Sequence, residues 1–247
     1  MDQSIEQFAQ DLARASYSSG TCAAYVAVAK RLADVLGKPF DKATRDDVRR
    51  FVDGLGDIST GRFNVALSAV LFLFRRTLGR SEVVSFIKVP RRHSKLPPVL
   101  SIEEVHGLLR AIKEPRLQAI AMVMYGAGLR ISEALALKVG DINRNRGVIH
   151  VRKGKGRKER EARLSPTLYE WLREYWRRTR PPEPFLFSSR KTGKPPVVAT
   201  VRNAIAAAAK DAWIKVHVTP HVLRHSFATH LLDEGFDLHV VRDALAR

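Results

Sequence analysis

The segment VPRRHSKLPPVLS, residues 89–101, places the strongest constraint on how this chain can fold. It contains Pro90, Pro97 and Pro98, and its apolar residues have no helical periodicity. Because proline fixes φ and lacks a backbone N–H, a regular helix cannot continue through such a segment. We therefore expect two domains, residues 1–86 and 101–247, joined by an extended basic linker over residues 87–100.

The region before this linker has the apolar periodicity of helices throughout. The pattern predicts helices over residues 5–15, 20–36, 45–55 and 61–78. The last of these contains VALSAVLFLFRRTL, which is apolar on most sides. Such a pattern is typical of the central helix in a small bundle.

The region after the linker mixes helices with a short hairpin. Ser101 and Glu104 fit an S-x-x-E capping box that begins a helix. A helix over residues 117–125 is expected to end at the turn GAG, with Arg130 at the start of the next helix. Strands are expected over residues 148–152 and 161–164, on either side of KGKGRKER. The predicted fold class is therefore mainly α with a small antiparallel β-sheet.

The segment TPHVLRHSFATHLL, residues 219–232, is the most informative about function. Thr219 is a suitable N-cap and Pro220 suits the first helical position. Helical spacing gives a side with His221, Arg224, His225 and Ala228, and a buried side with Leu223, Phe227 and Leu231. A guanidinium beside an imidazole near a helix N-terminus is suited to phosphate binding. The alternative is a surface helix with two satisfied histidines.

The net charge favours a polyanionic partner. The chain has 43 Lys and Arg against 25 Asp and Glu, a net charge of +18, and a pI of about 10.6. Nucleic acid is the first candidate. An acidic membrane surface is the alternative, but we find no basic amphipathic helix, lipidation signal, signal peptide or spanning segment. We therefore expect a cytoplasmic protein with no membrane partner.

No cofactor or metal ion is expected. The hairpin KGKGRKER lacks the G-x-x-x-x-G-K-[ST] pattern of a nucleotide-binding loop, so we reject an NTPase. His217, His221 and His225 recur every four residues, but no carboxylate or cysteine joins them at ligand spacing. The single cysteine, Cys22, lies among small and apolar residues that suggest burial.

Three segments, GAGLRISEALAL, the GKG hairpin and HVLRHSFATHLL, occur in an order and spacing that resembles the tyrosine recombinases of the phage integrase and Xer type. The resemblance covers nearly all of the chain. It implies an N-terminal core-binding, SAM-like helical bundle followed by a tyrosine-recombinase catalytic domain. It also implies double-stranded DNA as partner, a homo-oligomer or a full-length recombinase on that DNA, and integration or recombination through a phosphotyrosyl intermediate.

The resemblance also implies roles for particular residues. Arg130 and Arg224 match the two arginines that hold the non-bridging oxygens of the scissile phosphate. Lys155 matches the hairpin lysine that protonates the leaving 5′-hydroxyl, and His221 matches the histidine that assists proton transfer on the attacking side. Glu133 and His225 look like supporting residues; for Arg130, a plain surface ion pair with Glu133 is the alternative.

Further basic residues are expected to contact DNA. They lie in the last helix of the first domain, in the linker and in the hairpin. They are Arg62, Arg75, Arg91, Arg92, Lys95, Lys153 and Lys158.

The chain departs from the family pattern at its last residues. Where the family has Gly-His, this sequence has Ala246 and Arg247, and the family's nucleophilic tyrosine lies further on. All five tyrosines, Tyr17, Tyr25, Tyr125, Tyr169 and Tyr175, precede the His221 helix and fit packing roles. We therefore expect a truncated chain that does not cleave DNA.

Three alternatives stay open. The first is a non-catalytic regulator or competitor that binds recombination sites. The second is an active recombinase whose sequence was cut short, with a tyrosine in the frame just downstream. The third is a transcription factor that uses GAGLRISEAL as a helix-turn-helix, although such a regulator has no need of Lys155, His221 and Arg224 together.

Overall fold

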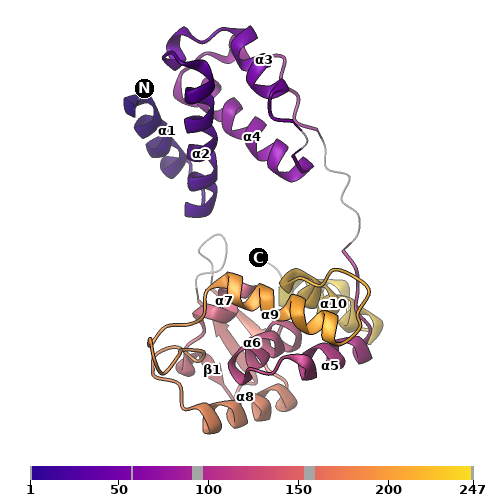
Figure 1. The fold of residues 1–247 in the computed structure, drawn as a ribbon. Helices are drawn as coiled ribbons and strands as arrows, with labels where there is room; N and C mark the ends of the chain where they lie inside the picture. Colours follow the sequence, from indigo (N-terminus) through magenta and orange to yellow (C-terminus); the bar gives the residue numbers. More distant parts are fainter. Residues whose placement is uncertain (1, 57, 91–96, 153–158, 246–247) are drawn as a thin grey trace. The chain divides into compact units, whose positions relative to one another are not determined.

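The computed structural model describes residues 2–56, 58–90, 97–152 and 159–245. The chain divides into two compact units, Met1–Ser94 and Lys95–Arg247, and each has its own hydrophobic core. Figure 1 follows the chain through α1 to α4 of the first unit and through the later helices and strands of the second.

The first unit is a small helical bundle. Its helices are α1 (Asp2–Arg14), α2 (Ser19–Leu36), α3 (Arg45–Asp53) and α4 (Thr60–Phe72). These are the four helices that the periodicity predicts, with ends that differ by a few residues. α4 continues into a π-helical turn, Leu73–Thr77, and Phe74 in that turn is fully buried. α4 packs against α2, which in turn packs against α1.

A buried carboxylate fixes the start of α3. The Thr44 backbone N–H donates to Asp47 Oδ2 at 2.8 Å, and the Asp47 N–H donates to Thr44 Oγ1 at 3.3 Å. Lys38 Nζ lies 2.6 Å from the same carboxylate, and Arg50 Nη2 lies 2.5 Å from it. Hydrogen bonds from Lys38, Thr44 and Arg50 hold the pKa of Asp47 well below its usual range. The helix start is therefore charged as well as capped.

The second unit consists of helices around a small sheet. Its helices are α5 (Ile102–Ala111), α6 (Pro115–Gly126), α7 (Ile131–Ala136), α8 (Pro166–Thr179), α9 (Val198–Asp211), α10 (Pro220–Asp233) and α11 (Leu238–Leu245). Its strands are β1 (Ile142–Asn143), β2 (Val148–Val151) and β3 (Arg160–Arg163), paired antiparallel in the order β1-β2-β3. The predicted fold class is confirmed. β1 was not expected, because two residues are too few for an alternating pattern.

α6 is the central helix of this unit. It packs against α8, α9 and α10, and Figure 1 shows it among them. Ile120 and Met124 lie on it with almost no exposed surface. α5 begins as predicted, since the Ser101 N–H donates to Glu104 Oε2 at 2.8 Å and the Glu104 N–H donates to Ser101 Oγ at 3.2 Å.

α10 is tied to the start of the second unit by its side chains. The Leu100 N–H donates to Ser226 Oγ at 3.0 Å, and the Leu100 carbonyl oxygen lies 2.9 Å from His230 Nε2. Because a carbonyl oxygen can only accept, Nε2 carries the proton, and Nδ1 accepts from the Tyr125 hydroxyl at 2.8 Å. α10 is thereby held against α6 as well as against Leu100.

None of the helices in the described ranges combines the length and apolar character needed to cross a bilayer.

Replacing Phe74 by alanine should destabilise the first unit by about 3–5 kcal/mol, because the lost ring leaves a cavity in a closely packed core. Urea unfolding followed by circular dichroism would measure the change. Val35→Ala, at an exposed position of α2 in the same unit, is the control and should change stability by less than about 0.5 kcal/mol. Equal effects of the two substitutions would contradict the assignment of Phe74 to the core.

Candidate phosphate-binding site

The turn between α6 and α7 positions Arg130. Gly128 has a φ of +60°, a conformation that glycine adopts without strain. Two residues later, Arg130 has extended backbone angles and immediately precedes α7. Its backbone N–H donates to Glu133 Oε2 at 2.8 Å. The first turn of α7 is therefore closed by the same carboxylate that binds the Arg130 side chain.

Glu133 is the centre of the site. Its side chain is only 3% exposed. Arg130 Nη1 donates to Oε1 at 2.7 Å, Arg160 Nη2 donates to Oε2 at 2.8 Å, and Arg224 Nη1 lies 3.6 Å from Oε2. Burial alone would raise the pKa of Glu133, but the hydrogen bonds from Arg130 and the charge of Arg160 outweigh it and lower that pKa. One buried carboxylate thus gathers three guanidinium groups from α10, β3 and the α6–α7 turn.

Arg224 reaches the site from α10. Its Nη1 also donates to the carbonyl oxygen of Gly128, in the turn that positions Arg130. Burial, followed by repulsion from Arg130, lowers the pKa of Arg224 to about 10. Arg224 therefore stays protonated at neutral pH. Three positive groups around one negative group leave an excess of positive charge, which favours an oxyanion.

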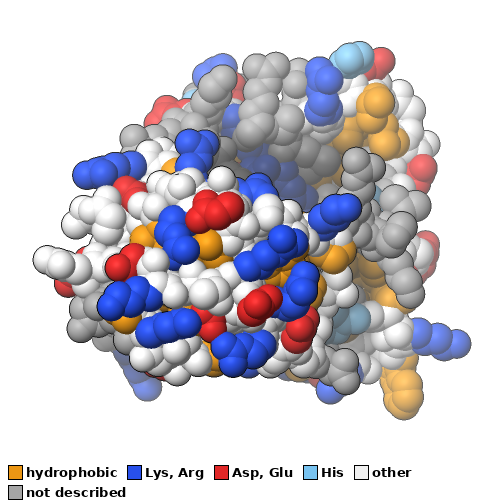
Figure 2. Space-filling view, turned by 90° about the horizontal axis from the view of Figure 1, so that it is seen from above, with side chains coloured by type: hydrophobic (Ala, Val, Ile, Leu, Met, Phe, Trp, Pro, Cys, Tyr) orange, Lys and Arg blue, Asp and Glu red, His pale blue; other side chains and the backbone are white. Residues whose placement is uncertain are grey.

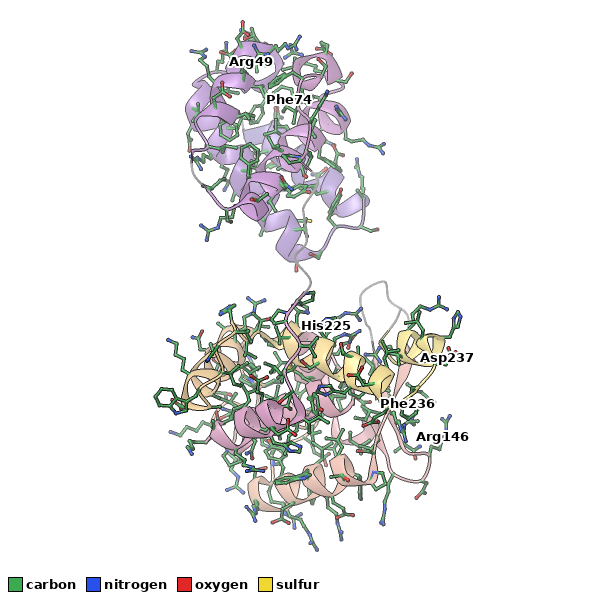
Figure 3. The ribbon with its side chains drawn as sticks, turned by 90° about the vertical axis from the view of Figure 1, so that its right-hand side faces the viewer. Arg49, Phe74, Arg146, His225, Phe236 and Asp237 are labelled. Carbon is green, nitrogen blue, oxygen red and sulfur yellow. The ribbon has the colours of Figure 1, made fainter. Side chains whose placement is uncertain are left out.

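The structure brings together the two predicted arginines and Glu133. Arg130 does pair with Glu133, as the alternative interpretation expects, but the carboxylate is buried, so the pair is not a surface ion pair. His221 is exposed in the first turn of α10, one turn before Arg224. His225, labelled on the helix in Figure 3, is half-buried.

Of the other basic residues predicted to act on DNA, the structure describes only two. Arg62 and Arg75 are exposed on the first unit. The remaining candidates lie outside the described residues, and they are Arg91, Arg92, Lys95, Lys153, Lys155 and Lys158. Arg247, which stands where the family has a histidine, also lies outside them. On the face drawn in Figure 2, Lys and Arg side chains are spread widely, with Asp and Glu side chains between them.

The prediction for α10 was right at the start of the helix and wrong at one position of its buried face. Thr219 is the N-cap residue and Pro220 the first helical residue, as predicted, although the Thr219 side chain makes no capping hydrogen bond. Ala228, expected on the side of the donors, is buried, while Leu223 and Phe227 are buried as predicted. The buried face is wider than one stripe because α10 packs against both α6 and α11.

A cation–π contact follows α10 in the chain. The guanidinium of Arg163, in β3, lies over the ring of Phe236, 5.4 Å from its centroid, and Phe236 is labelled in Figure 3.

Sequence reasoning did not assign Arg160 to the site. Arg160 is the last residue of the hairpin segment KGKGRKER, for which no role beyond basic charge is predicted. In the structure its side chain is 10% exposed and bound to Glu133. The alternation in β3 could have indicated this, because Arg160 and the buried Ala162 lie on one face while Glu161 and Arg163 are exposed.

The tyrosines have packing roles, as expected. Tyr25 and Tyr175 are buried, and burial raises the pKa of each hydroxyl. Burial also raises the pKa of Tyr125, whose hydroxyl is hydrogen-bonded to His230. Tyr17 packs against Tyr25, and Tyr169 packs under the guanidinium of Arg144.

Both units match models of known protein domains. Residues 98–246 match the Phage integrase family, and residues 5–82 match the N-terminal SAM-like domain of phage integrases. The chain therefore belongs to the phage integrase family of tyrosine recombinases.

Individual relatives agree with this assignment. A putative integrase/recombinase, y4qK, of Sinorhizobium fredii is 36% identical over 96% of this chain and 78% of its own length. The tyrosine recombinase XerA of Pyrococcus furiosus is 33% identical over 98% of this chain and 84% of its own length. Among solved structures, a lambda integrase dimer on a COC′ core site has the same fold, with a TM-score of 0.80 at 16% identity, over 100% of this chain and 94% of that one.

Replacing Glu133 by glutamine should lower stability at pH 7 by about 3 kcal/mol, because it leaves three arginines without their buried partner. The folded protein holds the pKa of Glu133 below its unfolded value. The stabilisation is therefore present above an unfolded pKa of about 4.3 and is lost as pH falls through the lower folded pKa. Urea unfolding at pH 7, 5 and 3 should show the two proteins converging in acid.

Glu161→Gln is the matched control, since Glu161 pairs with Arg146 at the surface. It should cost less than about 1 kcal/mol at any of these pH values. A stability difference between wild type and E133Q that stays constant from pH 7 to pH 3 would contradict the buried-carboxylate account.

Proposed function

We propose that this chain binds double-stranded DNA and holds a backbone phosphate between Arg130 and Arg224 during site-specific recombination. The observation that carries the proposal is the position of Glu133. Its buried carboxylate binds Arg130 and lies 3.6 Å from Arg224, so both guanidinium groups are fixed before any substrate arrives.

This arrangement suits phosphoryl transfer. The reaction places negative charge on the non-bridging oxygens of the phosphate, and preorganised guanidinium groups stabilise that charge without further rearrangement. Where a nucleophile is present, His221, exposed one turn before Arg224, is proposed to assist proton transfer at the attacking oxygen. Lys155 is proposed to protonate the leaving 5′-hydroxyl.

The partner is inferred from charge and from the relatives. The net charge of +18 suits a phosphate backbone. Solved structures of similar fold include a lambda integrase tetramer bound to a Holliday junction and the XerH recombinase bound to its difH substrate. We propose that this chain also acts as an oligomer on duplex DNA. Arg62 and Arg75 of the first unit would contact the backbone, together with the linker and hairpin residues named above.

Strand cleavage needs a nucleophile as well as a phosphate site. We propose that residues 1–247 by themselves bind DNA without forming a covalent adduct. The environment of three of the five tyrosines supports this, because Tyr25 and Tyr175 are buried and Tyr125 donates to His230. A hydroxyl enclosed in this way cannot approach a phosphorus atom. The other two are held by ring contacts, Tyr17 with Tyr25 and Tyr169 with Arg144.

Binding to a duplex should weaken steeply with salt, with log affinity falling linearly with log salt concentration. Arg62→Ala and Arg75→Ala should each reduce the slope by about 1, because each would remove one phosphate contact. Fluorescence anisotropy with a labelled duplex between 50 and 300 mM salt would measure this. Arg178→Ala, at an exposed position of α8 where the arginine pairs with Glu174, is the control for loss of charge alone. An affinity that does not change with salt would contradict the proposal.

No covalent product is expected when residues 1–247 are incubated with nicked duplex DNA that carries the protein's own recombination site. A denaturing gel that detects protein-linked DNA would test this. An adduct band would contradict the expectation, and mapping the modified residue would then identify the nucleophile.

A further inference from the structure

Two strands of the sheet are tied at one end to buried carboxylates. Arg160 begins β3, opposite Val151, and its Nη2 donates to Glu133. Arg152 follows β2, and its Nε donates to Asp141 Oδ1 at 2.5 Å. Both carboxylates are almost fully buried, with 3% of the Glu133 side chain and 2% of the Asp141 side chain exposed. Each strand end thus has an arginine bound to a buried carboxylate, and we call these two pairs, Arg160–Glu133 and Arg152–Asp141, the anchors.

The two anchors differ in what else their carboxylates bind. Asp141 accepts a hydrogen bond from the backbone N–H of Lys138 at 3.0 Å, and so stabilises the turn between these two residues. Glu133 binds Arg130 and lies close to Arg224. The arginines differ as well, since the Arg152 side chain is 57% exposed and that of Arg160 is 10% exposed. Only the Arg160 anchor, of these two, is connected to the phosphate-binding arginines.

The individual oxygens of Glu133 show how Arg160 can act. Oε1 accepts from Arg130 Nη1 at 2.7 Å. Oε2 accepts from Arg160 Nη2 at 2.8 Å and lies 3.6 Å from Arg224 Nη1. Arg160 and Arg224 thus approach the same oxygen, and Arg160 makes the shorter contact. The Arg130 backbone N–H also donates to Oε2 at 2.8 Å. Without Arg160, Oε2 would keep that hydrogen bond but would lose its guanidinium partner and could form a closer pair with Arg224, at the expense of an incoming oxyanion.

We propose that Arg160 is a positioning residue, which acts through Glu133 to hold Arg130 and Arg224 in the geometry that binds an oxyanion. The inference rests on the proposed function, phosphate binding at these two arginines. Arg160 is not required to touch the phosphate. Its role is to fix the orientation of the carboxylate and to connect β3 to α7 and α10.

The test uses residues 1–247 with inorganic phosphate as the probe. The guanidinium 15Nε–1H NMR signals of Arg130 and Arg224 are followed during a phosphate titration of wild type, Arg160→Met, Arg160→Lys and Arg152→Met. Arg160→Met should weaken phosphate binding roughly tenfold, because a charge-assisted hydrogen bond that orients the site is lost. Arg152→Met, which removes the matched anchor, should change affinity less than twofold. Arg160→Lys keeps the charge without the fork and should recover part of the loss.

A second readout needs no ligand. The pKa of the Glu133 carboxyl, followed by 13C NMR, should rise in Arg160→Met, because Arg160 is one of the groups that lower it. It should be unchanged in Arg152→Met. A purely structural loosening of the hairpin would affect both methionine variants alike and would not be relieved by lysine.

The outcomes separate the inference from the function on which it rests. Wild-type phosphate affinity in Arg160→Met, or equal losses in Arg160→Met and Arg152→Met, would overturn the positioning role while leaving phosphate binding intact. Wild-type Arg130 and Arg224 signals that do not respond to phosphate would overturn the proposed function itself, and the inference with it.

Discussion

The burial of Glu133 is the constraint on which the site depends. A carboxylate that is 3% exposed loses nearly all of its hydration, and only direct hydrogen bonds and opposite charges can replace it. Those partners come from a turn, a strand and a helix that are distant in sequence. The α6–α7 turn, β3 and α10 must therefore come together around this carboxylate. The positive charge of the site therefore arises only when the second unit folds, because no single segment contains all three arginines.

α10 carries two kinds of contact on one helix. Leu223 and Phe227 bury it against the core, and Ser226 and His230 bind both backbone groups of Leu100. Arg224 lies between these contacts, and its guanidinium donates to the Gly128 carbonyl. The position of Arg224 is therefore set by packing and by backbone hydrogen bonds before its charge has any effect. This explains how a long, flexible side chain can be preorganised.

Local patterns in the sequence predicted most of the helices. These are the helices whose ends are set by contacts between residues close together in the sequence. The capping box at Ser101 depends on two residues three positions apart, so the sequence alone predicts it. Arg130 and Arg224 were identified from motifs, through resemblance to a family. Arg160 was not, because its role depends on the register of β3 against β2 and on a carboxylate 27 positions away. Ala228 was misplaced for a related reason, since the packing of α6 and α11 around α10 cannot be inferred from the sequence of α10 alone.

The depressed pKa of Arg224 bears on which residue types can occupy this position. The environment lowers that pKa to about 10, and the side chain remains charged at neutral pH. A lysine has a lower pKa than an arginine in water, so the same burial and the same repulsion would leave a lysine less fully charged. The site therefore favours arginine over lysine on charge, in addition to the geometry of the two-pronged hydrogen bonding that only a guanidinium offers.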